Sequence, residues 1–141
     1  MILIADSGSS KTDWRVLSHH GSIQQAKTIG FNPFYQPPEH FDKDIREVLL
    51  PQISKEVEAI YYYGAGCSTE ANRNIIKDVL SKYFDNAHIV VSHDLLAAAR
   101  ALCGDQSGIA CIIGTGVNSC YYDGSNIVEN VSSFCYILGD E

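Results

Sequence analysis

The sequence predicts an α/β fold organised around a mixed sheet. Three observations predict it: three short strand-like stretches open the chain, helical and strand-like stretches then alternate, and the opening strand–loop–strand–turn–strand pattern returns near residue 106. The order β-β-β-α-β-α-β-α implies that the strands after helices run parallel and that the helices pack on the faces of the sheet.

Each element is justified by its local pattern. Met1–Asp6 is an apolar run of strand length, and small hydroxylated residues separate it from the next strand. The stretch from Glu39 to Val57 has apolar residues at helical spacing until Pro51 interrupts or ends the helix. Ser68 or Thr69 can cap the next helix. The expected strands are 1–6, 13–17, 23–29, 58–63 and 87–92, and the expected helices are 39–57, 69–83 and 94–102.

A second, unfinished copy of the opening pattern is expected at the end of the chain. Strands are predicted at 109–113, 117–122 and 126–131, with a hairpin turn at Asp123-Gly124 between the last two. No helix follows before residue 141. We therefore expect a first lobe at 1–105 and a truncated second lobe at 106–141.

Composition and charge exclude some partners. The chain has 141 residues, 45% of them hydrophobic, and its formal net charge of -7 comes without any cluster of Lys or Arg. Nucleic acid and anionic membranes are therefore poor partners. The five cysteines include no C-x-x-C pair, as expected for reduced thiols of a cytoplasmic protein. There is no signal-peptide pattern and no apolar run of membrane-spanning length.

The loop after the first strand is a candidate anion site. Gly8 allows a close backbone approach, and the amides and hydroxyls of Ser7, Ser9, Ser10, Lys11 and Thr12 can converge on phosphate oxygens. Asp6 ends a buried strand at the mouth of this loop, where a phosphate-bound Mg²⁺ is its natural partner. An ordinary hairpin turn explains the same residues equally well.

Two further stretches carry candidate chemistry. The loop Gly114-Thr115-Gly116, followed by Asn118, could hold the other end of a polyphosphate. Asp94 follows a parallel strand and could accept a proton from a substrate hydroxyl, although an Asp at that position is also a good helix cap. The aromatic loop around Asn32 could line a small-molecule pocket or merely cover the sheet edge.

Together these motifs resemble a known superfamily. Asp6-x-Gly8-x-Ser10-Lys11-Thr12, Gly114-Thr115-Gly116-x-Asn118-Ser119 and Leu138-Gly139-Asp140-Glu141 look like the phosphate motifs of the acetate kinase/sugar kinase/Hsp70/actin superfamily and the segment that follows them. The chain is most similar to the BadF/BadG/BcrA/BcrD ATPase-type family, particularly its N-acetylglucosamine kinase branch. The resemblance implies a ribonuclease H-like (actin-like ATPase) lobe followed by an incomplete second lobe.

The resemblance also implies roles for individual residues. Asp94 falls where the family has its catalytic base, and Asn32 falls on a sugar-contacting asparagine. Gly64-Ala65-Gly66 falls on a loop beside the sugar, and Asp140 on another polar residue near it. ATP phosphates and Mg²⁺ are expected at the two hairpins. The family continues beyond Asp140 into a segment that includes its adenosine site, so the fragment alone is expected to be inactive.

Three functions remain open on sequence alone. The first is ATP-dependent phosphoryl transfer to an amino sugar such as N-acetylglucosamine. The second is an iron–sulfur ATPase that activates a 2-hydroxyacyl-CoA dehydratase or benzoyl-CoA reductase, for which Cys67 could supply a thiolate. The third is a non-catalytic sugar-sensing ATPase, which would have no need of Asp94. Exposed apolar strand edges in an unfinished lobe favour self-association, and we expect a homodimer.

Overall fold

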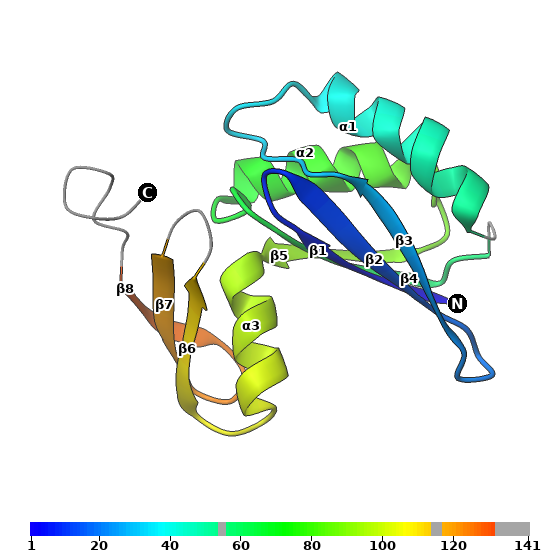
Figure 1. The fold of residues 1–141 in the computed structure, drawn as a ribbon. Coiled ribbons are helices and arrows are strands. Elements are labelled where there is room, and N and C mark those ends of the chain that lie inside the picture. The colour runs from blue at the N-terminus through cyan, green and yellow to red at the C-terminus, as the bar shows by residue number, and fades with distance from the viewer. Residues whose placement is uncertain (54–55, 114–116, 132–141) are drawn as a thin grey trace. The chain divides into compact units, whose positions relative to one another are not determined.

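The chain forms two compact units, Met1–Asp94 and Leu95–Glu141. The computed structural model describes residues 1–53, 56–113 and 117–131 (Figure 1). Each unit has its own sheet and its own cluster of buried side chains. The lobe boundary expected between residues 105 and 106 is a different division of the chain and stays a prediction.

The first unit is built on a five-stranded mixed sheet in the order β3-β2-β1-β4-β5. The first three strands form antiparallel pairs, whereas β1 pairs with β4, and β4 with β5, in parallel. The predicted α/β fold and element order are confirmed. The strands are β1 (Ile2–Ser7), β2 (Lys11–Leu17), β3 (Ile23–Ile29), β4 (Ala59–Gly64) and β5 (His88–His93).

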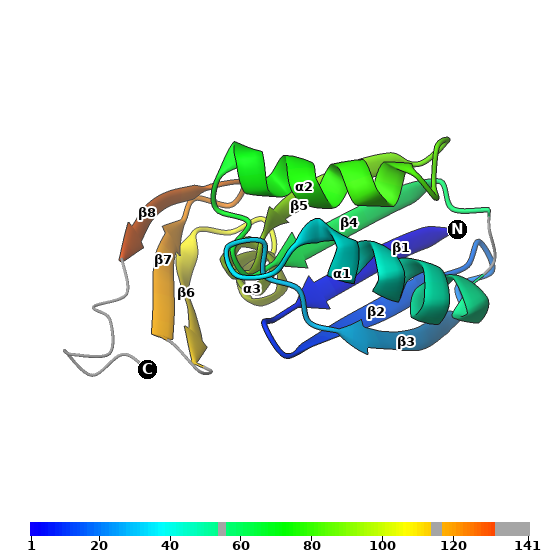
Figure 2. The same ribbon diagram turned by 90° about the horizontal axis from the view of Figure 1, so that it is seen from above.

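Two helical stretches lie side by side on one face of this sheet (Figure 2). The first comprises α1 (Pro38–Asp44), a π-helical turn η1 (Ile45–Leu49) and a 3₁₀ turn η2 (Leu50–Gln52). It ends at Gln52 because Pro51 cannot continue the helical hydrogen bonding. The second is α2 (Glu70–Ser81).

The start of α2 shows a side-chain cap of the predicted kind. Thr69 has an extended backbone, and its side-chain oxygen accepts a hydrogen bond from Asn72 N at 3.2 Å. A cap of this kind is worth about 1 kcal/mol. Of the two candidates, Ser68 and Thr69, the structure therefore selects Thr69.

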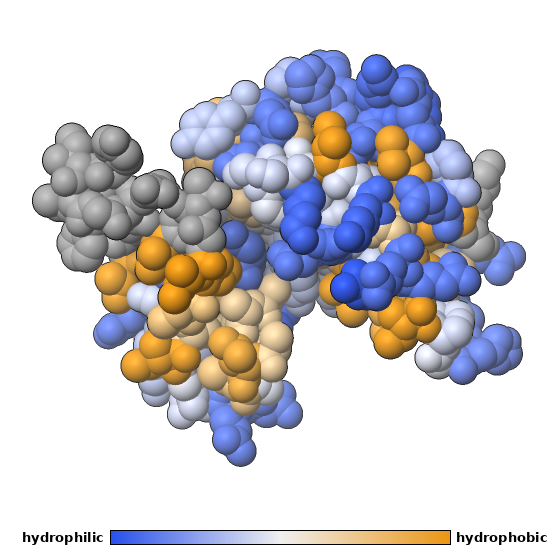
Figure 3. Space-filling model, viewed as in Figure 1, coloured by the Kyte–Doolittle hydropathy of each residue, from blue (hydrophilic) through white to orange (hydrophobic). Residues whose placement is uncertain are grey.

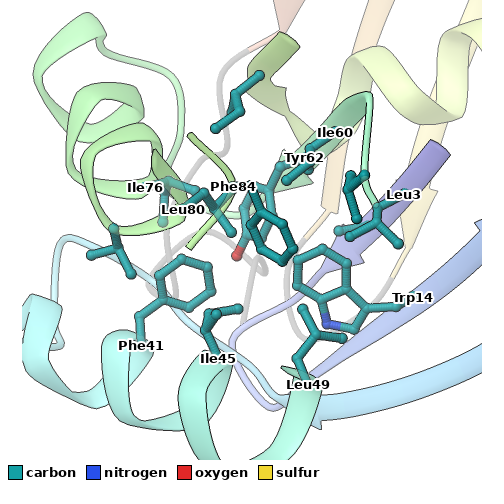
Figure 4. Close-up of a cluster of buried hydrophobic side chains, with 14 of the residues drawn as sticks. Leu3, Trp14, Phe41, Ile45, Leu49, Ile60, Tyr62, Ile76, Leu80 and Phe84 are labelled. Atoms are coloured by element: carbon teal, nitrogen blue, oxygen red, sulfur yellow. The ribbon is translucent and has the colours of Figure 1, made fainter. Parts of the chain in front are cut away.

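The core lies between the helices and the sheet face that they cover (Figure 4). Alternate residues of each strand point to it, so Leu3 of β1, Trp14 of β2 and Tyr62 of β4 are fully buried. The rings of Phe41 and Tyr62 meet edge to face with centroids 5.6 Å apart. Burying one such large apolar side chain contributes about 1.5–3 kcal/mol, so this face is the main source of stability.

The second unit is a three-stranded antiparallel sheet in the order β6-β7-β8 that packs on helix α3. Its inner face contributes Ala110, Cys120 and Tyr122 to a small core with Leu95 and Ala99. The elements are α3 (Asp94–Cys103), β6 (Gly108–Ile113), β7 (Val117–Tyr122) and β8 (Ile127–Val131).

The other face of this small sheet is apolar and exposed. Ile109 and Ile113 of β6 are 74% and 83% exposed, and Val117 of the neighbouring strand is also exposed. Hydrophobic residues are correspondingly prominent on the surface of this unit (Figure 3). Among the helices described, none combines the length and the hydrophobicity needed to cross a membrane.

One buried polar atom in the first core lacks a partner among the described residues. The hydroxyl of Tyr62 is buried and makes no hydrogen bond within that part of the chain, although the hydroxyls of Ser7 and Thr12 lie near enough to oppose the burial that raises the pKa of Tyr62. A buried hydroxyl without a partner costs free energy that an apolar group of the same shape does not.

We therefore expect Tyr62→Phe to raise the free energy of unfolding by about 1 kcal/mol, measured by urea denaturation. Tyr83→Phe is the matched control, because Tyr83 Oη donates to Asp42 Oδ2 at 3.0 Å and its loss should lower stability. Destabilisation of similar size in both variants would contradict this assignment.

Candidate phosphate and substrate site

The parallel pairing of three strands brings several of the predicted site residues to one sheet edge. Ser7 of β1, Gly64 of β4 and His93 of β5 lie opposite one another in the register. The loops that follow β1 and β4, and the start of α3 after β5, therefore leave the sheet at the same level (Figure 1). This is the edge at which ligands of α/β sheets gather.

The hairpin between β1 and β2 is tight, with Gly8 N donating to Lys11 O at 2.9 Å. Gly8, Ser9 and Ser10 are exposed and free to face a ligand. Ser7 and Thr12 are not, because both are fully buried.

The hydroxyls of Ser7 and Thr12 support this hairpin from within. Their side-chain oxygens are 2.7 Å apart, and Thr12 Oγ1 donates to Ile29 O at 3.1 Å. The sequence predicted that these two hydroxyls face a phosphate. The structure gives them internal partners instead, and Gly8 N already donates to Lys11 O, so the exposed residues Ser9 and Ser10 remain as candidate donors for an anion.

Gly30 fits against the hairpin at a point where no side chain can be accommodated. A Cβ at Gly30 would lie 2.5 Å from the backbone nitrogens of Ser10 and Lys11 and would also clash with Gly8 O. The loop after β3 therefore packs directly on the hairpin between β1 and β2, which is called the phosphate hairpin below because the sequence predicted phosphate binding there. Sequence reasoning missed this role, since the contact joins residues far apart in the chain.

Asp6 is the carboxylate that the sequence predicted to face a metal ion. Burial raises the pKa of Asp6, and the nearby carboxylates of Asp94 and Asp13 raise it further. Asp13 is itself paired, with Lys11 Nζ at 2.8 Å and Lys27 Nζ at 3.8 Å, and its pKa is lowered chiefly by the hydrogen bond from Lys11. The first unit thus brings the carboxylates of Asp6 and Asp94 within electrostatic reach of each other.

Asn32 is held in a fixed orientation beside Gly66. Its side-chain oxygen accepts from Phe34 N at 3.0 Å, and its backbone N donates to Gln36 Oε1 at 2.7 Å. Gly66 has a positive φ of 76°, and a Cβ there would clash with Asn32 Oδ1. Two of the five residues predicted to lie at the sugar therefore touch each other, and the Asn32 side-chain nitrogen has no hydrogen-bond partner among the described residues.

The loop that contains Gly64, Ala65 and Gly66 is tied to the phosphate hairpin. Ala65 N donates to Ser7 O at 2.8 Å, which joins the end of β1 to the start of the loop. Arg73 of α2 holds the residues that follow this loop, because its guanidinium donates hydrogen bonds to Cys67 O and Ser68 O at 3.2 and 2.9 Å. Arg73 is a second residue that sequence reasoning missed, because nothing in the local pattern marks it.

The residues next to Asp94 are partly shielded from water. Burial lowers the pKa of His93, while Asp94 opposes that shift. Burial, with a further contribution from Asp94, raises the pKa of Cys67 to about 11, so this thiol stays protonated at neutral pH. No group of three His, Cys, Asp or Glu side chains in the described ranges could hold a metal ion by itself.

The remaining predicted site residues lie either outside the described residues or in the second unit. Gly114, Thr115, Gly116 and Asp140 lie outside the described residues. Asn118 is on β7 in the second unit, where its side-chain oxygen is buried and makes no hydrogen bond within the described part of the chain.

Comparison with solved structures places this geometry in a known fold. The chain is 48% identical to the putative N-acetylglucosamine kinase of Porphyromonas gingivalis, with a TM-score of 0.91 over 100% of this chain and 51% of that one. The corresponding protein of Chromobacterium violaceum is 20% identical, with a TM-score of 0.65 over 99% and 51% of the two chains. MreB5 of Spiroplasma citri bound to ADP is 14% identical, with a TM-score of 0.69 over 92% and 50%.

These comparisons define the class of fold. The chain has the mixed α/β fold of the actin-like ATPases. It spans about half the length of the proteins to which it is similar. No protein-family model matches the sequence. A search among proteins of curated function also finds no match.

Two glycines of the hairpin region should respond differently to substitution. Gly30→Ala should lower the free energy of unfolding by about 2 kcal/mol or more, because the new methyl group meets backbone atoms that cannot move aside. Gly8→Ala should change it by less than about 0.5 kcal/mol, because the nearest atom, Lys11 O, is 3.7 Å away. Urea denaturation measures both, and equal losses would contradict the close packing of Gly30.

Asp6 should destabilise the fold when it is ionised and no cation is present. The pKa of Asp6 is raised above the ordinary 3.8, so the folded state binds the proton more tightly than the unfolded state. The stabilisation that this gives at low pH is lost as the pH rises from about 3.8 through the raised pKa. At pH 7 without divalent cations, Asp6→Asn should therefore raise the thermal midpoint. Added Mg²⁺ should stabilise the native chain and not the variant.

Asp13→Asn is the control of opposite sign. Because the pKa of Asp13 is lowered, its ionised carboxylate stabilises the fold at any pH above its ordinary pKa of 3.8. Asp13→Asn should therefore have a lower thermal midpoint at pH 7. Equal midpoints of the native chain and Asp6→Asn across pH 3–8, in thermal melts, would overturn the assignment of Asp6.

Proposed function

We propose that the protein is an ATP-dependent kinase that phosphorylates an amino sugar of the N-acetylglucosamine type. The supporting observation is the shared sheet edge, where the register sets the phosphate hairpin, the Gly64–Gly66 loop and the end of β5 at one level. The similarity to the Porphyromonas gingivalis protein supports the same substrate class. The proposal includes membership of the BadF/BadG/BcrA/BcrD ATPase-type family.

The residues of the first unit fit a bound Mg²⁺. Asp6 is an exposed carboxylate whose pKa is raised by burial and by two other carboxylates, so a divalent cation would relieve an unfavourable charge. Asp6 would hold the ion, directly or through water. A bound Mg²⁺ would neutralise charge on the β- and γ-phosphates of ATP.

The first unit also supplies groups that can bind and orient the substrates. The amides of the hairpin and the hydroxyls of Ser9 and Ser10 would receive phosphate oxygens. The Asn32 side-chain nitrogen would donate to an oxygen of the sugar, and its orientation is set by the hydrogen bond from Phe34 N. Positioning of this kind supplies much of the acceleration in phosphoryl transfer.

Asp94 would act as the general base. Its carboxylate would take the proton of the attacking sugar hydroxyl while that oxygen bonds to the γ-phosphorus of ATP. The bond between the γ-phosphorus and the bridging oxygen breaks, and ADP leaves with the electron pair. The products are a sugar phosphate, ADP and a proton, which Asp94 returns to water.

The iron–sulfur alternative is less well supported by the structure. A cluster between two subunits needs thiolates at the surface, whereas Cys67 is fully buried and its raised pKa favours the protonated thiol. We therefore propose the kinase function without a cluster.

The kinase function is tested on the complete gene product with Mg-ATP. The assay measures sugar phosphate formed from N-acetylglucosamine, glucosamine, glucose and N-acetylmannosamine. Phosphorylation of an amino sugar is expected, and hydrolysis of ATP without any sugar phosphate would contradict the proposal. Iron in anaerobically purified protein would favour the activator class instead.

Asp94→Asn should abolish phosphoryl transfer and leave nucleotide affinity nearly unchanged. We expect a loss in kcat of at least about 10²–10⁴-fold, because general-base catalysis contributes that much. Asp78→Asn, at an exposed carboxylate on α2, is the control and should retain full activity. Turnover of Asp94→Asn within tenfold of the native enzyme would rule out Asp94 as the base.

A further inference from the structure

Asp44 is a buried carboxylate that the proposed chemistry does not use. It ends α1 where the π-helical turn η1 begins, and it is only 8% exposed. Its Oδ2 accepts a hydrogen bond from Ile29 N at 3.0 Å. Burial raises the pKa of Asp44, and the Ile29 N–H and the Thr28 hydroxyl oppose that shift. A carboxylate buried in this way is costly unless its hydrogen bonds are kept.

The residue that Asp44 binds is held on both sides. Ile29 N donates to Asp44, and Ile29 O accepts from Thr12 Oγ1, which in turn lies 2.7 Å from Ser7 Oγ. Ile29 is the last residue of β3. Its backbone therefore connects the carboxylate on α1 to the two hydroxyls beneath the phosphate hairpin.

The segment that follows Ile29 leads directly into the candidate substrate loop. Gly30 packs on the hairpin backbone, and Asn32 lies against Gly66. Between them, Phe31 is buried and stacks on Phe41 of α1 with ring centroids 5.0 Å apart. A shift of Ile29 would thus move the hairpin support and the Asn32 loop together.

We propose that Asp44 is a positioning residue that fixes segment 29–32 and so couples nucleotide binding at the hairpin to sugar binding at Asn32. The inference rests on the proposed function, because it takes the two ligands from it. It adds a residue far from the reacting atoms whose effect is on the coupling between two sites.

Asp44→Asn is the substitution that changes the surroundings of this residue least. The carboxylate borders an open groove of about 370 Å³ lined also by Ile29, His40, Lys43, Glu47 and Val48. Asn at this position keeps the shape and one acceptor oxygen for Ile29 N but removes the charge and the second acceptor. A hydrogen bond to a neutral acceptor is weaker than one to a carboxylate.

The protein contains its own reporter for this segment. Trp14 is the single tryptophan of the sequence and is fully buried. Its Nε1 donates to Thr28 Oγ1 at 2.9 Å, next to Ile29 and beside Asp44. A change in the position of segment 28–29 should therefore change the Trp14 fluorescence.

The test measures coupling in the complete gene product. The affinity for Mg-ADP is determined by calorimetry with and without saturating N-acetylglucosamine, and the part of any fluorescence change that Trp14→Phe removes is assigned to Trp14. In the native protein the sugar should tighten Mg-ADP binding by about tenfold. The ratio of the Mg-ADP affinities with and without sugar should fall to about one in Asp44→Asn. This variant should still phosphorylate the sugar, with a raised KM for both substrates.

Glu47→Gln is the matched control. Glu47 lines the same groove, but it is half exposed, and its ion pairs among the described residues are with Lys43 and Arg46, so its variant should keep the native ratio. A merely structural role for Asp44 would lower the thermal midpoint and leave the ratio unchanged.

The outcomes separate this inference from the proposed function. An unchanged ratio in Asp44→Asn, or a native ratio of one, overturns the positioning role even if the sugar is phosphorylated. Binding of both ligands with the expected coupling, but without sugar phosphate, contradicts the kinase function and supports the role of Asp44. Absence of any sugar binding overturns both.

Discussion

The in-register parallel pairing of β1, β4 and β5 is the constraint on which the candidate site depends. Because Ser7, Gly64 and His93 stand at one level, three segments distant in the chain leave the sheet together. A shift of one residue would turn alternate side chains to the opposite face and move Ser7 out of the core. The buried partners Leu3, Ile60 and Ile89 on the core face oppose such a shift.

Side chains on the two faces of the sheet have different roles at this edge. Side chains on the face covered by α1 and α2, such as Ser7 and Thr12, are buried and hold the backbone in place. Side chains on the other face, such as Asp6 and Asp13, carry charge and remain accessible to ions. A strand alternation of period two therefore separates structural support from ligand chemistry within a single hairpin.

Much of the fold follows from sequence periodicity, whereas the contacts within the site do not. The spacing of apolar residues located α2 and α3 well, and Thr69 was recognisable as a cap. The inward direction of Ser7 and Thr12 could have been inferred by continuing the alternation of Leu3 and Trp14. The packing of Gly30 on Ser10 could not, because it depends on how two separate loops meet in space.

The same limit applies to the first helical stretch. Its sequence pattern predicts a helix within 39–57 that Pro51 interrupts or ends, and the structure also has a π-helical turn directly after Asp44, which the pattern did not predict. A π-helical turn inserts an extra residue into the helical path and is less favourable than a regular turn, so it persists where tertiary contacts hold it. One tertiary contact at the start of this turn is the hydrogen bond from Ile29 N to the Asp44 carboxylate.

The buried polar groups beneath the hairpin form a weak point in an otherwise apolar core. Ser7, Thr12 and Tyr62 place three hydroxyls at the end of the core, and that of Tyr62 makes no hydrogen bond to any residue that the structure describes. Apolar residues would pack there with less desolvation cost, but they could not hold Ile29 O through a hydrogen bond. If the hairpin binds phosphate, this polar layer exchanges some stability for a fixed backbone geometry, because the hairpin amides can receive an anion only while the strands beneath them stay in place.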